Sequence, residues 1–363
     1  MKMAFYGSSL LSSYWNGAAT YYRGLLGALA RLGYDITFYE PDVFDRQKNK
    51  DIEPPDWCSV VVYDATPQGL LQVAKRASEA DIVVKASGVG YEDEALLLEV
   101  LRHSRSDALT VFWDVDAPAT LAQLRAEPDH PLHRALRKLD LILTYGGGDP
   151  VVYAYRAMGA AHCIPIYNAL DPATHHPVSP VERFRADLSF LGNRLPDREA
   201  RVDTFFLGPA ARSPARTFLM AGAGWDNKTM PGNVGWIGHV GTADHNAFNV
   251  STGAVLNISR ESMASNGFSP ATRVFEAAGA GACLISDYWM GIEFFLKPDE
   301  EILVVRDEQD VVDVLEQLSP QKSRAIGAAA LHRVLAEHTY ERRARQADET
   351  FRNFAKRSME AAE

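Results

Sequence analysis

The 363-residue sequence has little of several features that mark whole classes of protein. Its three cysteines, Cys58, Cys163 and Cys283, are far apart and form no CxxC pair, so we expect three buried thiols and neither disulfides nor a zinc cluster. Lys and Arg (37) are outnumbered by Asp and Glu (47), and the resulting net charge of −10 predicts no general attraction to nucleic acid or to an anionic membrane. The first apolar run breaks at Gly7, which is too early for a secretory signal or a transmembrane helix. We therefore expect a cytoplasmic protein.

Two common nucleotide-binding motifs are also missing. The segment after the first expected strand, residues 7–24 (GSSLLSSYWNGAATYYRG), contains neither GxGxxG nor GxxxxGK[ST], which disfavours a nicotinamide-binding Rossmann enzyme and a P-loop NTPase. Gly17 precedes an expected helix, where it either lets a ligand approach the helix N-terminus or simply forms a tight turn. Ser8, Asn16 and Gly17 are our candidates for the acceptor side of a cleft.

Strands and helices alternate along the whole chain. Expected strands cover residues 2–6, 35–42, 58–64, 81–87, 109–118 and 140–147 in the first half, and 187–193, 216–222, 234–238, 254–259, 282–287 and 301–307 in the second. This pattern predicts an α/β protein with parallel sheets, built as two Rossmann-like, doubly wound domains that face a central cleft.

The expected domain boundaries follow from chain length and composition. A chain of 363 residues is long for one core, so we expect an N-terminal domain at 1–168 and a C-terminal, nucleotide-binding domain at 187–337. Prolines are frequent between them, and residues 169–186 are predicted to be a linker. A charged amphipathic helix in residues 338–363 is expected to return to the N-terminal domain.

The richest segment for chemistry is residues 256–291, LNISRESMASNGFSPATRVFEAAGAGACLISDYWMG. Two expected strands bracket a helix that we expect to begin at Ser269, a good N-cap residue. Its free N–H groups, the Ser269 hydroxyl, Arg260 and Arg273 would together hold a pyrophosphate. Glu276, within two turns of the cap, suits the hydroxyl groups of a ribose.

Asp114 and Asp116 end an expected strand in the first half of the chain. We expect this pair to act as a general base or to bind an acceptor hydroxyl. Alternatively, Asp116 caps the following helix. His175 and His176 lie in the expected linker and are interpreted as solvated.

Several segments resemble the CgeB-like (spore-maturation type) glycosyltransferases, relatives of the large retaining group 1 family, also called family four. They are SPATRVFEAAGAGACLISDYW with GIEFFLKPDEEILVVRD, IPIYNALDPATHHP, LSFLGNR and GNVGWIGHV. The resemblance implies the glycosyltransferase-B fold and transfer of a sugar, a hexose with retention, from a nucleoside diphosphate to a hydroxyl or amine, without an obligatory metal. It makes Glu276 the ribose ligand and assigns further donor contacts to Gly192, Asn193 and Arg194 at the diphosphate and to Gly238, His239 and Val240 at the base.

One position departs from the family pattern, which has two glutamates separated by seven residues. Phe268 stands eight positions before Glu276, and aligning on Gly267 and Phe268 puts Asn266 in place of the first glutamate. The donor-site candidates therefore include Asn266, Gly267 and Phe268. Two other hypotheses stay open: an enzyme that isomerises or hydrolyses the sugar nucleotide, and a non-catalytic binder of sugar nucleotides.

Overall fold

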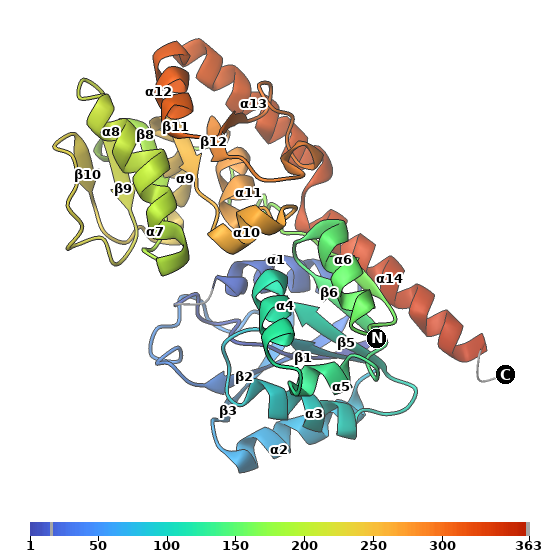
Figure 1. Ribbon diagram of the computed structural model, residues 1–363. Helices are drawn as coiled ribbons and strands as arrows, with labels where there is room; N and C mark the ends of the chain where they lie inside the picture. Colours follow the sequence, from blue (N-terminus) through green and yellow to red (C-terminus); the bar gives the residue numbers. More distant parts are fainter. Residues whose placement is uncertain (15–16, 361–363) are drawn as a thin grey trace. The chain divides into compact units, whose positions relative to one another are not determined.

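The chain divides into two compact units, each built around one parallel β-sheet (Figure 1). The computed structural model describes residues 1–14 and 17–360, with side chains described through residue 354. Unit 1 comprises Met1–Tyr167 and Tyr340–Glu363, and unit 2 comprises Asn168–Thr339. Residues 169–186, expected to link two domains, thus belong to unit 2 by their contacts.

Unit 1 contains a seven-stranded sheet in the order β3-β2-β1-β4-β5-β6-β7, with all neighbouring strands parallel. Its strands are β1 (Lys2–Tyr6), β2 (Asp35–Asp42), β3 (Cys58–Asp64), β4 (Ile82–Ala86), β5 (Leu109–Asp114), β6 (Leu141–Thr144) and β7 (Cys163–Pro165). The sequence predicts the first six. The seventh was missed because a three-residue edge strand that ends in proline is too short to show a strand pattern.

Helices connect the strands of unit 1. They are α1 (Ala18–Arg31), α2 (Pro67–Lys75), η1 (Arg76–Glu79), α3 (Asp93–His103), α4 (Ala117–Ala126), α5 (Pro131–Ala135), α6 (Gly148–Ala157) and the C-terminal α14 (Tyr340–Glu360). Helix α14 packs against α1, and the Tyr34 hydroxyl donates a hydrogen bond to Asp348 Oδ1 at 2.7 Å. The C-terminal helix therefore completes unit 1.

Unit 2 contains a six-stranded parallel sheet in the order β10-β9-β8-β11-β12-β13. Each segment predicted as a strand in this half forms one: β8 (Ala186–Leu191), β9 (Phe218–Ala221), β10 (Val234–Trp236), β11 (Thr252–Asn257), β12 (Leu284–Asp287) and β13 (Leu303–Val305). The strand order reverses between β8 and β11. In a doubly wound sheet, such a reversal opens a crevice at the carboxyl edge.

The helices of unit 2 lie between these strands and after them. They are η2 (Glu182–Phe184), α7 (Pro196–Val202), η3 (Asp203–Leu207), α8 (Gly208–Arg212), α9 (Thr242–Val250), α10 (Glu261–Asn266), α11 (Thr272–Gly279), η4 (Ile292–Phe294), α12 (Glu308–Gln317) and α13 (Pro320–Glu337). The central strand β11 is apolar on both faces, with Ala254, Val255 and Leu256 at most 1% exposed. Continuous apolar runs of this kind are typical of parallel strands that are covered on both sides.

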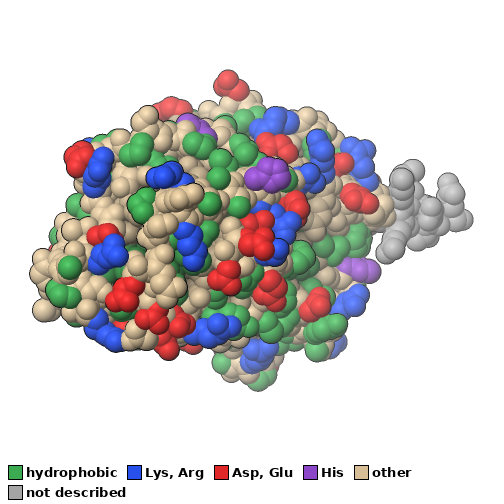
Figure 2. Space-filling view, turned by 90° about the horizontal axis from the view of Figure 1, so that it is seen from above, with side chains coloured by type: hydrophobic (Ala, Val, Ile, Leu, Met, Phe, Trp, Pro, Cys, Tyr) green, Lys and Arg blue, Asp and Glu red, His purple; other side chains and the backbone are tan. Residues whose placement is uncertain are grey.

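The three cysteines are buried and free, as the sequence predicts. On the face shown in Figure 2, Lys and Arg side chains are interspersed with Asp and Glu. Within the described ranges, no helix combines the length and the apolar character that crossing a bilayer requires.

Candidate functional site

A small cavity opens at the carboxyl edge of the unit 2 sheet, where the strand order reverses. It has a volume of about 130 Å³ and is formed by the ends of β8 and β11, by helix α7 and by the start of α11. A larger cavity of about 730 Å³ lies at the opposite, amino edge of the same sheet, beside Asp187, Thr252 and Cys283. We place the candidate site in the smaller cavity because ligands of doubly wound sheets bind outside the carboxyl ends of the strands, at the switch point.

Two arginines bring positive charge to this cavity. Arg198 from α7 and Arg273 from α11 line it, and the Nε atom of each is buried without a hydrogen-bond partner. Burial lowers the pKa of Arg198, an effect that nearby Asp197 opposes. Within the described part of the chain Arg198 forms no ion pair, whereas Arg273 Nη1 lies 3.4 Å from Glu276 Oε2. Partly unsatisfied guanidinium groups beside a helix N-terminus favour a phosphate-like anion.

Gly192, at the end of β8, makes room for one of these arginines. A Cβ atom at this position would lie 2.7 Å from Arg198 Nη1, closer than real Cβ contacts allow. Gly192 is predicted from the sequence to contact the donor, and in the structure its missing side chain leaves space for the Arg198 guanidinium.

Helix α11 directs its first turn at the cavity but begins later than predicted. It starts at Thr272 with Ala271 as N-cap, so the predicted start at Ser269 is wrong. The chain turns at Gly267 and Phe268, whose φ angles are 73° and 46°, and the residues that follow are not yet helical. Ser269 is buried and donates its hydroxyl hydrogen to the Gly267 carbonyl at 2.9 Å. The helix N-terminus at the cavity is therefore formed by the backbone at Thr272, without a capping hydroxyl.

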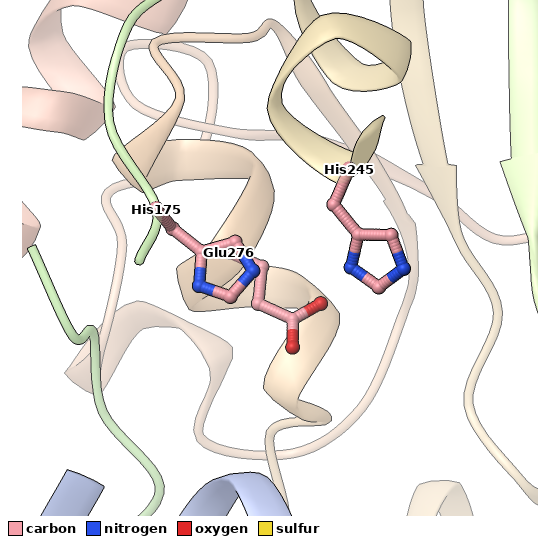
Figure 3. Close-up of side chains that lie close together, drawn as sticks. All are labelled: His175, His245 and Glu276. Carbon is pink, nitrogen blue, oxygen red and sulfur yellow. The ribbon is translucent and has the colours of Figure 1, made fainter. Parts of the chain in front are cut away.

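Glu276 lies one turn beyond Arg273 on α11 and is only 8% exposed. Figure 3 shows its carboxylate beside the imidazole rings of His175 and His245, which come from two other segments of unit 2. One ligand atom from each of the three side chains can be chosen so that all lie within 4.8 Å of one another. Neither histidine was placed near Glu276 by the sequence analysis, which assigned no metal-binding residues.

His175 is 2% exposed, which corrects the expectation that it is solvated. The segment that carries it packs closely against α11: a Cβ atom on Gly279 would lie 2.2 Å from Leu170 Cδ1 and 3.2 Å from the His175 carbonyl oxygen. This contact needs a glycine on the helix. The next residue, His176, is exposed as expected.

The charge states around Glu276 follow from burial and from one cation. Burial lowers the pKa of His175, and it lowers that of His245 to about 4 with help from Arg273. Burial acts to raise the pKa of Glu276, but Arg273 and the two histidines outweigh it, and the net shift is downward. Arg273 is the largest of the effects that lower the pKa of Glu276 and keep its carboxylate ionised.

Two other arginines expected at the diphosphate are paired with carboxylates and do not line the cavity. Arg194 binds Glu199 through two hydrogen bonds of 2.8 and 2.7 Å, and it donates to Asn227 Oδ1 at 2.6 Å. Hydrogen bonds from Arg194 and a neighbouring lysine lower the pKa of Glu199 to about 2. Arg260 donates from Nε to Asp197 Oδ2 at 2.7 Å. The structure thus brings Arg198, rather than these two, to the cavity beside Arg273.

The remaining donor candidates hold neighbouring loops in place. Asn193 Oδ1 accepts a hydrogen bond from the Ala223 amide at 3.0 Å, and the Gly238 carbonyl accepts one from the Gly222 amide at 2.7 Å. His239 is exposed, whereas Val240 is buried in an apolar cluster. Gly238 is therefore half-buried and His239 exposed, whereas Val240 is part of the core.

Asn266 and Phe268 are the residues that the resemblance aligns with the first glutamate of the family pattern. Asn266 ends α10, and its Nδ2 atom is buried without a hydrogen-bond partner. The Phe268 amide donates to the Met290 carbonyl at 2.7 Å, and a Cβ atom on Gly291 would lie 2.3 Å from the Phe268 ring. A positive φ at a bulky residue costs on the order of 1–3 kcal/mol, so the surrounding contacts must hold this turn.

Comparison with known proteins finds similarity in part of the sequence and in the fold. Residues 198–349, fewer than half of the chain, match the family model described as Glycosyl transferase-like. A search among curated proteins found no significant match. Among solved structures, sucrose-phosphate synthase from Thermosynechococcus elongatus aligns over 98% of this chain and 99% of its own, with a TM-score of 0.72 and 14% identity. HepE of Anabaena in complex with UDP and glucose aligns over 97% and 100%, with a TM-score of 0.70 and 13% identity. BGT of phage T4 in complex with UDP-glucose aligns over 99% of both chains, with a TM-score of 0.58 and 11% identity.

The chain has the glycosyltransferase-B fold. Its two Rossmann-like units are those that the sequence predicts.

In unit 1 of this glycosyltransferase-B fold, Asp114 ends β5 but does not face solvent. It is 0% exposed and accepts hydrogen bonds from Ser87 Oγ at 2.7 Å, from Thr120 Oγ1 at 3.0 Å, from the Asp116 amide at 3.0 Å and from the Tyr155 hydroxyl. Burial raises its pKa, although these hydrogen bonds oppose the shift. Asp114 thus joins the ends of β4 and β5 to α4 and α6 and does not face a cleft as expected, whereas its role as a base or acceptor ligand stays a prediction. Asp116 stands at the N-cap position of α4, but its side chain makes no capping hydrogen bond, so the alternative that it caps the helix holds for its position only.

The acceptor-side candidates lie after β1. Ser8 is buried, and its carbonyl accepts a hydrogen bond from Arg46 at 3.3 Å. Gly17 is exposed at the N-cap of α1 with φ −62°, and a Cβ atom there would meet nothing within 4 Å. Its own conformation therefore does not require glycine. Asn16 lies outside the described residues.

Arg198 is the site residue that the sequence analysis missed. Its only signal was its place in LPDREARV, an acidic and basic turn directly after the strand end LGNR. That signal is shared with Arg194 and Arg201. Which of the three arginines points into the cavity depends on where α7 begins, and it begins at Pro196.

Proposed function

We propose that this protein is a glycosyltransferase of the CgeB-like type, which moves a sugar, a hexose with retention, from a nucleoside diphosphate to a hydroxyl or amine acceptor. The observation that carries the proposal is the cavity at the switch point of unit 2. There Arg198 and Arg273 lie beside the first turn of α11, with Glu276 one turn further along. HepE, which has the same fold, binds UDP and glucose, and this supports a nucleotide-sugar donor.

Each part of the site has a chemical role in this proposal. The two arginines and the α11 N-terminus hold the diphosphate without a metal ion, because guanidinium groups and free N–H groups already supply positive charge. Glu276 accepts hydrogen bonds from the ribose hydroxyls, and Arg273 keeps its carboxylate ionised. The backbone around Gly238 and His239 lies beside the base.

The test is a binding and turnover assay in two stages. Thermal shift with UDP-, GDP-, ADP- and dTDP-sugars identifies the donor, since a ligand at a hundred times its Kd stabilises the folded state by about 2.7 kcal/mol. The best donor is then incubated with sugar, lipid and amine acceptors, and released nucleotide is measured. Acceptor-dependent release supports transfer. Release at the same rate without any acceptor would instead support a hydrolase.

A second candidate function rests on Phe268. A phenylalanine in a strained turn stands where the family pattern has a glutamate that contacts the transferred sugar. This favours, as the alternative, a non-catalytic sugar-nucleotide-binding protein. Tight donor binding with no nucleotide release under any acceptor would support it.

A further inference from the structure

We propose that His175, His245 and Glu276 form a binding site for one divalent late first-row metal ion, for which Zn²⁺ is the probe. The site lies wholly within unit 2 and joins three separate segments: the turn after Asp171, helix α9 and helix α11. Within the described residues, no second group of three or more potential His, Cys, Asp or Glu ligands comes as close together.

Unsatisfied nitrogen atoms are the first observation. His175 Nε2 and His245 Nδ1 are both buried without a hydrogen-bond partner, and His175 as a whole is 2% exposed. Buried polar atoms in folded proteins are nearly always satisfied, so two orphaned nitrogens on the rings beside the Glu276 carboxylate favour a bound ligand there. A cation that is coordinated by the two imidazole lone pairs and by the carboxylate satisfies all three groups together.

The orientation of His245 is the second observation. Its Nε2 atom lies 3.2 Å from the Val240 carbonyl, an acceptor, which assigns the proton to Nε2 and leaves a lone pair on Nδ1. Metal-binding histidines commonly donate their other N–H to a backbone carbonyl in this way, which fixes the tautomer and the ring. His245 is therefore held in the form that a metal requires.

The ligand set selects the class of ion. Two imidazoles and one carboxylate form a typical three-ligand zinc set with one position left for water, whereas Mg²⁺ prefers oxygen ligands alone. In tetrahedral geometry the ligand atoms lie about 3.3 Å apart, given metal–ligand bonds of roughly 2.0–2.1 Å. In the structure the ligand atoms lie within 4.8 Å of one another, so metal binding requires them to move closer by up to about 1.5 Å, which small side-chain torsional changes allow. Arg273 approaches Glu276 Oε2 at 3.4 Å and leaves the other oxygen for the ion.

The site consists of protein groups alone and does not rest on the proposed sugar transfer. Because Glu276 also carries the proposed ribose contact, Zn²⁺ is titrated into the nucleotide-free, full-length protein, and nucleotide binding is measured separately in the presence of EDTA. Failure of one proposal then leaves the other testable.

The experiment is calorimetric titration of Zn²⁺ into wild type, His175→Ala, His245→Gln and His176→Ala, with Mg²⁺ as the control ion. We expect one Zn²⁺ per chain, an affinity lowered at least ~10-fold in each of the first two variants, and no change in His176→Ala, whose side chain is exposed next to the site. X-ray absorption should show nitrogen and oxygen ligands at about 2.0–2.1 Å with imidazole scattering.

Circular dichroism confirms that each variant is folded, and His245→Gln, at a partly exposed position, provides the test if His175→Ala does not fold. No Zn²⁺ binding by wild type would overturn the proposal. So would binding that survives loss of either His175 or His245, binding that is lost in His176→Ala, or equal affinity for Mg²⁺.

Discussion

Replacing Arg198 by methionine tests the assignment of the diphosphate site most directly. Methionine keeps an apolar stem but removes the guanidinium group, whose Nε atom is buried and unpaired and which forms no ion pair within the described residues. A hydrogen bond between a charged group and a ligand contributes about 1.5–3 kcal/mol, which corresponds to a loss of roughly 10- to 150-fold in affinity for a nucleoside diphosphate. The bare nucleoside offers no phosphate and should bind equally well to both proteins.

Arg198→Met is also expected to change the stability of the folded protein, in the direction opposite to most substitutions of half-buried residues. A half-buried cation without an ion-pair partner opposes folding, so Arg198→Met should not lower the free energy of unfolding measured in urea and is expected to raise it. Arg194→Met is the matched control. Its guanidinium is already bound to Glu199 outside the cavity, so its loss should cost stability with little effect on the diphosphate.

Calorimetry with the nucleoside, the nucleoside diphosphate and the sugar nucleotide distinguishes the possibilities. Equal losses for nucleoside and diphosphate in Arg198→Met would show that Arg198 acts on the shape of the pocket and not on phosphate. A larger loss in Arg194→Met than in Arg198→Met would restore the assignment made from the sequence.

Three further outcomes are expected. Glu276→Ala should weaken nucleotide binding but leave a 2′,3′-dideoxynucleotide unaffected, because only the ribose hydroxyls lose a partner; equal weakening of both in calorimetry would contradict this. Asp114→Asn should lower stability by about 1–3 kcal/mol, since four donors converge on the buried carboxylate, and leave donor affinity unchanged; a stable variant that has lost only turnover would restore a catalytic role. Asp187→Asn should make unfolding less sensitive to acid. Burial acts to raise the pKa of Asp187, but hydrogen bonds from Thr217 and Arg216 outweigh it and lower this pKa below 3.8 in the folded protein. The ionised carboxylate therefore stabilises the fold above about pH 4, and this stabilisation is lost as the pH falls through the pKa of the folded state. Urea unfolding of both proteins at pH 6 and pH 3 should show a difference that shrinks at pH 3, and a constant difference would refute the linkage.

The sequence by itself determined the two sheets except for the edge strand β7, because buried parallel strands need continuous apolar runs and these runs are local. All six strands of unit 2 lie where AVLNIS, ACLISD and their counterparts predict them. The same local information places Arg273 and Glu276 on one helix, three residues apart, so their proximity follows from helix geometry alone.

Only the tertiary structure decided which side chains meet across segments. Residues 168–176 pack against α11 because Gly279 leaves space, and this packing buries His175. From the sequence, the proline-rich stretch around His175 indicates a solvated residue. Asp114 resembles a catalytic carboxylate by its place at a strand end, but its four hydrogen-bond donors come from residues between Ser87 and Tyr155. Arg198 and Arg194 are nearly equivalent in the sequence, and packing of α7 directs only Arg198 to the cavity. Local patterns specify elements, whereas a site depends on distances between residues far apart in the chain, which the sequence pattern does not contain.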